Sequence, residues 1–128
     1  ATFNPSILIN EQVTEAPILH GSKTKEQAAA KALSLHHARE LPDPKNIGSR
    51  YPHQVSGGQL QRLMAAMALC GEPDLLVLDE PTTARDVTTQ IEGLKAAKKV
   101  IQEEGAAAIY VTHDLAVVAQ IADHIVVL

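Results

Sequence analysis

The sequence predicts an α/β fold in which a parallel sheet follows a mainly helical region. Two short apolar runs, at 75–78 (LLVL) and 106–111 (AAAIYV), each stop abruptly at polar residues. Runs without alternation are typical of strands buried on both faces, as in parallel sheets. Apolar residues between them recur at helical spacing as far as Gly105, and strand–helix–strand alternation indicates parallel pairing. A helix over 114–121 and a third strand over 125–128 are expected to follow.

The first half predicts helices joined by loops. Apolar residues from Ile9 to His20 follow a helical spacing, although Pro17 should disturb the end of that helix. Thr24 is expected to cap a second helix, because Gln27 stands three residues on, as in a capping box. That helix should end before the Leu-Pro pair at 41–42, and an irregular link over 51–55 should follow.

Composition limits the function classes. A chain of 128 residues is one domain or part of one. With 45% hydrophobic but only 2% aromatic residues, its core must be aliphatic. A net charge of -4 without a basic run argues against a nucleic-acid surface. The single Cys70 is expected to be a small buried apolar residue. The chain starts without Met and ends inside an apolar run, so we expect a piece of a longer protein.

Ser56 is predicted to open a third helix. Serine is a favoured N-cap residue, and Gly57 and Gly58 leave the first backbone N–H groups unobstructed. The helix dipole adds positive potential there, so the segment through Gln59 can form an anion cradle without a cation. By themselves these four residues fit an ordinary helix cap with a flexible lead-in better.

Carboxylates end the first apolar run. Open α/β sheets bind ligands at the carboxyl ends of their strands. Asp79 at that place can hold a metal directly or through water, and Glu80 can act as a general base toward water. Asp86 follows in the next loop. His113, just past the second run, should emerge at the same edge and can donate a hydrogen bond to a phosphate oxygen. The spacing of the other histidines predicts no zinc site.

These stretches resemble, in order, four motifs of the ATP-binding cassette (ABC) ATPases. The segment 55–62 (VSGGQLQR) looks like the signature motif, and 75–82 (LLVLDEPT) looks like Walker B. The D-loop corresponds to 83–86 (TARD) and the switch-histidine strand to 110–114 (YVTHD). Finer features resemble the oligopeptide, dipeptide and nickel importer branch: FNP at 3–5, YPH at 51–53, MAAMAL at 64–69, PTTA at 81–84 and DLAVVA at 114–119.

The resemblance covers essentially the whole chain and implies a P-loop NTPase-like fold. A helical subdomain would occupy residues 1–71. Residues 72–128 would be the Walker B to switch-histidine part of an incomplete nucleotide-binding domain. ATP and Mg²⁺ are the implied cofactors.

The resemblance also implies residue roles. Asp79 would serve Mg²⁺, Glu80 would be the catalytic carboxylate, and His113 would sense the γ-phosphate. Asp86 would lie at the interface of a head-to-tail dimer. The nucleotide held by the opposite subunit would be bound by Ser56, Gly57, Gly58 and Gln59.

The implied function is ATP hydrolysis coupled to the uptake of peptides or similar small solutes. Its partners would be a second ABC ATPase subunit, membrane permease subunits and, indirectly, an extracytoplasmic solute-binding protein, with no nucleic acid. The location would be peripheral, at the cytoplasmic face of the cell membrane. Two alternatives stay open: a truncated, non-catalytic paralogue that only docks on partners, and an ABC ATPase outside transport.

Two departures from the family pattern bear on activity. Arg85 stands where the family usually has an apolar residue. The chain also contains no G-x-x-x-x-G-K-[ST] motif, and the GSKT at 21–24 misplaces the lysine. We therefore expect the chain alone to hydrolyse little or no ATP. Without central strands, its sheet should leave apolar edges open, which favours marginal stability or association.

Overall fold

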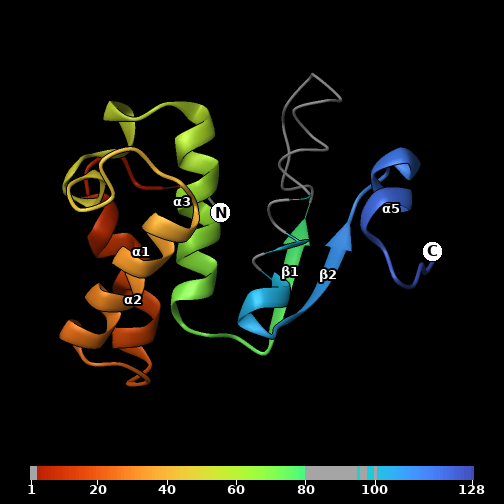
Figure 1. The fold of residues 1–128 in the computed structure, drawn as a ribbon, viewed down its shortest axis with the longest axis horizontal. Helices are drawn as coiled ribbons and strands as arrows, with labels where there is room; N and C mark the ends of the chain where they lie inside the picture. The colour runs from red at the N-terminus through yellow and green to blue at the C-terminus, as the bar shows by residue number, and fades with distance from the viewer. Residues whose placement is uncertain (1–2, 80–94, 96–97, 100) are drawn as a thin grey trace. The chain divides into compact units, whose positions relative to one another are not determined.

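The computed structural model describes residues 3–79, 95, 98–99 and 101–128. The chain divides into two compact units, Ala1–Pro73 and Asp74–Leu128 (Figure 1). The first unit contains α1 (Ile9–Leu19), α2 (Lys25–Ala38), the 3-10 turns η1 (Ile47–Ser49) and η2 (Pro52–Gln54), and α3 (Gly57–Cys70). The second contains β1 (Leu75–Asp79), β2 (Ala107–Val111) and α5 (Leu115–Ile121).

A capping box starts α2, as the sequence predicts. Gln27 N donates to Thr24 Oγ1 at 3.2 Å, and Thr24 N donates to Gln27 Oε1 at 3.0 Å. These bonds satisfy two of the N–H groups that a helix start leaves without an intrahelical acceptor. The predicted start of α2 is therefore confirmed.

Pro17 lies inside α1 rather than interrupting it. The helix continues to Leu19, and Pro17 is buried. The Pro17 carbonyl accepts hydrogen bonds from Ser22 N at 3.0 Å and Lys23 N at 3.2 Å. Proline in the last turn thus leaves the helix intact, and its carbonyl ties the helix end to the loop that leads to α2.

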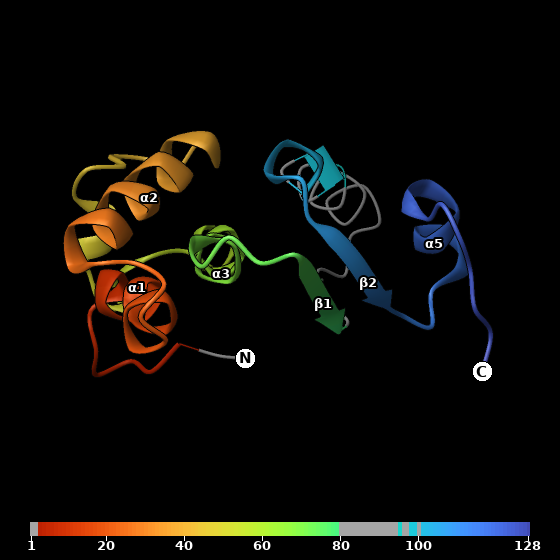
Figure 2. The same ribbon diagram turned by 90° about the horizontal axis from the view of Figure 1, so that it is seen from below.

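The helical unit buries a closed aliphatic core. Each of α1, α2 and α3 contacts the other two (Figure 2). Gly48 in η1 is required by close packing, because a Cβ there would collide with the side chain of Asn10 on α1. The almost fully covered aliphatic side chains are Ile9, Val13, Ala28, Ala32, Leu35, Ile47, Leu63, Ala66 and Leu69.

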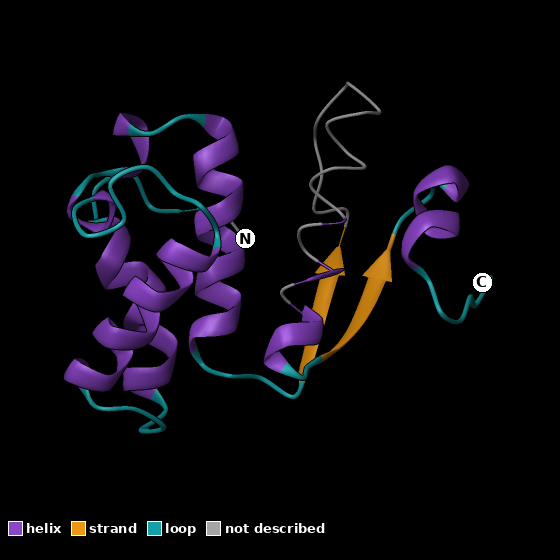
Figure 3. Ribbon diagram, in the orientation of Figure 1, coloured by secondary structure: helices purple, strands orange, loops and turns teal. Residues whose placement is uncertain are grey.

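The two strands pair in parallel, which confirms the predicted pairing (Figure 3). Leu75 registers with Ala107 and Asp79 with Val111. Ala107 N also donates to Asp74 O at 2.9 Å, so the ladder begins one residue before β1. The described residues 101–104 are helical and precede β2, as expected for a crossover between parallel strands.

The prediction that both strands are buried on both faces is wrong. Leu75 and Val77 are 51% and 63% exposed, and their neighbours Ile109 and Val111 on β2 are 51% and 47% exposed. The register places these four side chains on one face. Leu76, on the other face, is buried. No described element of this unit covers the face that carries Val77.

The predicted third strand is also wrong. Residues 125–128 form no strand and are exposed. Among the residues that the structure describes, the sheet consists of β1 and β2, and 125–128 join neither. An apolar run adopts a strand only where a neighbour takes its backbone hydrogen bonds, and the sequence pattern carries no information about that neighbour.

Candidate functional site

Ser56 caps α3 through a second reciprocal pair of hydrogen bonds. Gln59 N donates to Ser56 Oγ at 3.3 Å, and Ser56 N donates to Gln59 Oε1 at 3.0 Å. The predicted cap is therefore confirmed. A hydroxyl that accepts one hydrogen bond still carries its own proton, so Ser56 Oγ can donate to an anion while it caps the helix.

Gly57 and Gly58 form the open part of this helix start. They are the first two residues of α3, where backbone N–H groups have no intrahelical acceptor. A Cβ added at either glycine would meet no atom within 4 Å. The space around the Cβ positions of both glycines is thus open, and the α3 dipole makes this helix start favourable for negative charge. These residues fit a phosphate group.

The loop before Ser56 is more ordered than the irregular link that we expected. Tyr51 N donates to Gln54 Oε1 at 2.9 Å. The rings of Tyr51 and His53 stack with centroids 5.8 Å apart and planes 11° apart. The signal in the sequence is Gln54 three residues after Tyr51, the same spacing as in the two capping boxes. This turn sets the direction from which the chain enters α3.

The rest of α3, beyond its glycine start, is anchored in the helical core. Leu63 and Leu69 are buried, and Arg62 Nη1 donates to the carbonyl of Glu40 at 3.1 Å. Glu40 has a left-handed backbone (φ 53°) just after α2. The helix that begins at Gly57 is therefore held by both packing and a side-chain bond to the end of α2.

Asp79 and His113 lie at one edge of the parallel sheet. Asp79 is the last residue of β1 and registers with Val111, the last residue of β2. His113 follows two residues later, and both side chains are exposed. Exposed carboxylate oxygens are ligands that Mg²⁺ accepts in proteins, so Asp79 fits a metal ligand. Across the described ranges, no cluster of three histidine, cysteine or acidic residues could hold a metal ion.

Asp114 fixes the backbone around His113, a role that was not among the predictions from the sequence. Asp114 Oδ1 accepts hydrogen bonds from Ala116 N at 2.9 Å and Val117 N at 3.4 Å, which caps α5. Asp114 N donates to Thr112 Oγ1 at 3.1 Å. An aspartate directly before an apolar helical run was the available signal.

The predicted site residues Glu80 and Asp86 lie outside the described residues. Arg85, which departs from the family pattern, lies outside them as well. Of the eight predicted site residues, the structure thus describes the signature residues as one group and Asp79 and His113 as another. The first group belongs to the helical unit and the second to the sheet unit.

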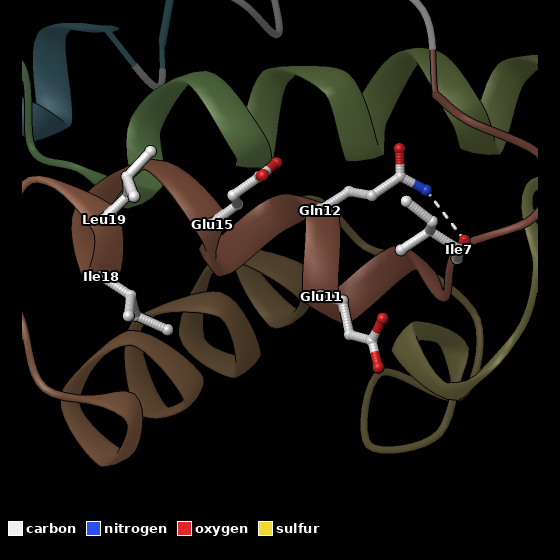
Figure 4. A pocket seen from close by; sticks show the side chains of 6 residues that line it. All are labelled: Ile7, Glu11, Gln12, Glu15, Ile18 and Leu19. Atoms are coloured by element: carbon white, nitrogen blue, oxygen red, sulfur yellow. Dashed lines mark hydrogen bonds between the residues drawn. The ribbon is translucent and has the colours of Figure 1, made fainter.

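A shallow hollow of about 340 Å³ lies along α1 and shares no residue with these groups. Figure 4 shows its side chains, with Gln12 Nε2 donating to the Ile7 carbonyl at 2.8 Å. Glu11 and Glu15 are exposed and contribute two carboxylates. The lining residues are Ile7, Glu11, Gln12, Glu15, Ile18 and Leu19.

The model of the family "ABC transporter" matches residues 1–83, and the chain belongs to that family. The dipeptide transport ATP-binding protein DppD of Bacillus subtilis (strain 168) is 43% identical over 126 residues, which are 98% of this chain and 38% of DppD. The glutathione import ATP-binding protein GsiA of Escherichia coli (strain K12) is 42% identical over 127 residues, which are 99% of this chain and 20% of GsiA.

Solved structures agree with this assignment. The dimeric structure of MJ0796, described as a bacterial ABC transporter cassette, superposes with a TM-score of 0.68 at 32% identity. That match covers 91% of this chain and 50% of the cassette. The same cassette in a post-hydrolysis state bound to ADP and Pi gives a TM-score of 0.65. The predicted ABC ATPase fold and the predicted resemblance to the peptide importer branch are confirmed.

No described helix is long and apolar enough to cross a membrane.

Proposed function

We propose that this chain is part of the ATP-binding subunit of an ABC importer that couples ATP hydrolysis to the uptake of peptides or similar small solutes. The observation that carries the proposal is the similarity to DppD and GsiA, which extends over 98% and 99% of this chain. The preformed cap at Ser56 adds a site that fits phosphate. The subunit would be peripheral, at the cytoplasmic face of the membrane.

The signature residues would bind the phosphates of ATP held by a second ATPase subunit. Support comes from the N–H groups of Gly57 and Gly58, from the open space beside these glycines, and from the hydroxyl of Ser56, which can still donate a hydrogen bond. The segment 56–59 contains no cation. A cradle without a cation suits an anion whose charge is already partly neutralised by other groups. Mg²⁺ and basic groups of a partner subunit would neutralise the charge of the phosphates in this way.

The sheet edge would carry the hydrolytic residues. In this proposal Asp79 helps to hold Mg²⁺, His113 donates a hydrogen bond to the γ-phosphate, and Glu80 is the catalytic carboxylate. Asp86 would lie at the interface with the second subunit. Bound Mg²⁺ would neutralise charge on the phosphates. Residues 1–71 would form the helical subdomain and 72–128 part of the catalytic core.

The hollow along α1 would meet a permease subunit. Its lining combines exposed apolar side chains, Ile7 and Leu19, with the carboxylates of Glu11 and Glu15, and it contains no cation. Charge complementarity therefore favours an amphipathic helix with basic residues as the occupant. Changing both glutamates to glutamine should weaken binding to permease subunits and should leave nucleotide binding unchanged.

A chimaera tests the proposal in a complete subunit. Residues 1–128 would replace the matching 126-residue segment of DppD, and dipeptide uptake and ATP hydrolysis would be measured with the DppD partners. We expect both activities to persist. Ser56→Ala, Glu80→Gln and His113→Ala should each abolish hydrolysis. The exposed Gln120→Ala on α5 is the matched control and should have no effect.

A folded chimaera that binds nucleotide but hydrolyses none would contradict the proposal and would favour the docking-module alternative. Hydrolysis without uptake would favour an ABC ATPase outside transport. The chain of 128 residues by itself should show no Mg-dependent turnover, because it contains no Walker A motif. A steady-state phosphate-release assay on the pure chain checks this expectation.

A further inference from the structure

Two lysines of the helical unit converge on one carboxylate just after α3. Lys23 Nζ lies 2.9 Å from Glu72 Oε2, and Lys31 Nζ lies 3.4 Å from Glu72 Oε1. The lysine side chains are only 15% and 18% exposed, whereas that of Glu72 is 55% exposed. Each carboxylate oxygen therefore meets its own cation. We call Lys23, Lys31 and Glu72 the carboxylate clamp.

The backbone of Glu72 is unusual for a residue with a side chain. Its φ is 50°, in the left-handed region that favours glycine. Gly71 precedes it as the C-cap of α3, and Glu72 N donates to Leu69 O at 2.9 Å. A glycine at position 72 would adopt this conformation without strain but would leave both lysines without this carboxylate. The two ion pairs give a physical reason for glutamate here.

The clamp stands one residue away from the sheet ladder. Pro73 is the last residue of the helical unit. Asp74 O already accepts a hydrogen bond from Ala107 N, so Asp74 belongs to the ladder of β1 and β2. Pro73 is thus the single residue between a group held by the helical unit and a group held by the sheet unit. Its ring also fixes its own φ.

We propose that the carboxylate clamp is a conformational device that limits rotation between the two units by keeping their link one residue long. With the clamp closed, the link consists of Pro73. With the clamp open, Gly71 and Glu72 join it, and Gly71 is the residue with the widest backbone freedom. Because the span of a flexible link grows as the square root of its length, a change from one to three residues widens it about 1.7-fold. This inference does not depend on the proposed function.

Distances between spin labels in the two units test the device in the full chain. Exposed positions for the labels are Ser34 on α2 and Gln102 in the sheet unit, each changed to cysteine. Cys70 is fully buried, and a sample without the two new cysteines checks that it stays unlabelled. The measured quantity is the width of the distance distribution between the two labels.

Glu72→Gln should widen the distribution, because the freed link spans a larger range, and Glu72→Gly should widen it as well. Glu26→Gln, which removes an exposed carboxylate from the first turn of α2, is the matched control and should leave the width unchanged. Lys23→Gln should widen it more than Lys31→Gln, because the pair between Lys23 and Glu72 is the shorter one. An unchanged width in Glu72→Gln, with full helical circular dichroism, would overturn the proposal.

Salt provides a second measurement, and its main readout is made on the parent chain. Raising NaCl to about 1 M shortens the screening length to roughly 3 Å and weakens exposed ion pairs. The distribution of the labelled chain should widen, and that of labelled Glu72→Gln should not widen further. Glu72→Gln could lose helical structure, and the salt measurement on the parent chain then decides. A distance distribution whose width does not change with salt in the parent chain would overturn the proposal.

Discussion

The two units of this chain differ in how completely they bury their apolar residues. In the helical unit, Ile9, Ile47 and Leu63 have no exposed surface. In the sheet unit, Leu76 and Val117 are the buried apolar residues among those that the structure describes. One face of the strand pair and the last four residues stay open to solvent.

This difference separates the two groups of candidate site residues. The helical unit completes its own core, so the candidate anion cradle at Ser56 stands on a packed helix. Asp79 and His113 stand on a sheet with one open face. Burying a large aliphatic side chain stabilises a fold by about 1.5–3 kcal/mol, and the exposed side chains on that face do not contribute this energy in full. The cradle should therefore be preorganised in the isolated chain, whereas the sheet edge should need further covering structure to become rigid.

Matched truncations in the two units should give the largest contrast. Leu63→Ala removes a fully buried side chain from α3 and should lower the free energy of unfolding of the helical unit by about 2–5 kcal/mol. Val77→Ala removes an exposed side chain from β1 and should change stability by less than about 0.5 kcal/mol. Urea denaturation followed by circular dichroism measures both. Equal losses would show that the face of Val77 is buried in solution.

A pair of glycine substitutions sharpens the contrast within the helical unit. Gly48→Ala places a methyl group against the side chain of Asn10 and should cost about 1–3 kcal/mol, as overpacking does. Gly58→Ala places it in open space at the start of α3 and should stabilise the helix by about 0.5–1 kcal/mol. Effects of opposite sign in thermal unfolding are expected. A stabilising Gly48→Ala would contradict the packing of η1 on α1.

The stability of the helical unit should also depend on pH, with a smaller effect than the substitutions above. His36 is buried, and burial lowers its pKa below the usual 6.5, although its Nδ1 lies 3.3 Å from the Pro44 carbonyl, which opposes the shift. The neighbouring His37 lowers the pKa further. Below pH 6.5 the unfolded chain therefore binds more protons at this histidine than the folded chain does. The free energy of unfolding should have its full value above pH 6.5 and should fall as the pH drops through the lowered pKa.

Urea midpoints between neutral and mildly acidic pH measure this slope. His36→Leu should flatten it, because no buried imidazole remains to be protonated. The exposed His37→Gln is the matched control and should retain most of it. A slope that survives unchanged in His36→Leu would assign the pH dependence to another group.

Elements with local signals were predictable from the sequence. Thr24 and Ser56 each have glutamine three residues later, and both capping boxes form. The strand over 75–79 and its parallel partner follow from apolar runs that end in polar residues. Burial of these strands was mispredicted, and so was the strand over 125–128, because burial and pairing depend on neighbours distant in the sequence.

The candidate site was predictable to the same extent. The edge shared by Asp79 and His113 follows from parallel pairing alone. The capping role of Asp114 and the turn formed by Tyr51 and Gln54 were missed, although both use short-range side-chain bonds. The clamp at Glu72 was not predictable, because Lys23 lies 49 positions away in the sequence.

Residue-resolved amide hydrogen exchange on the isolated chain tests the central claim most directly. The claim is that the helical unit completes its own core and is therefore more stable than the sheet unit, which leaves one face open. We predict that core amides of α3 exchange at least about a thousandfold more slowly than unfolded peptides and at least about tenfold more slowly than the amides of β1 and β2. Equal, strong protection of α3 and both strands would contradict the claim.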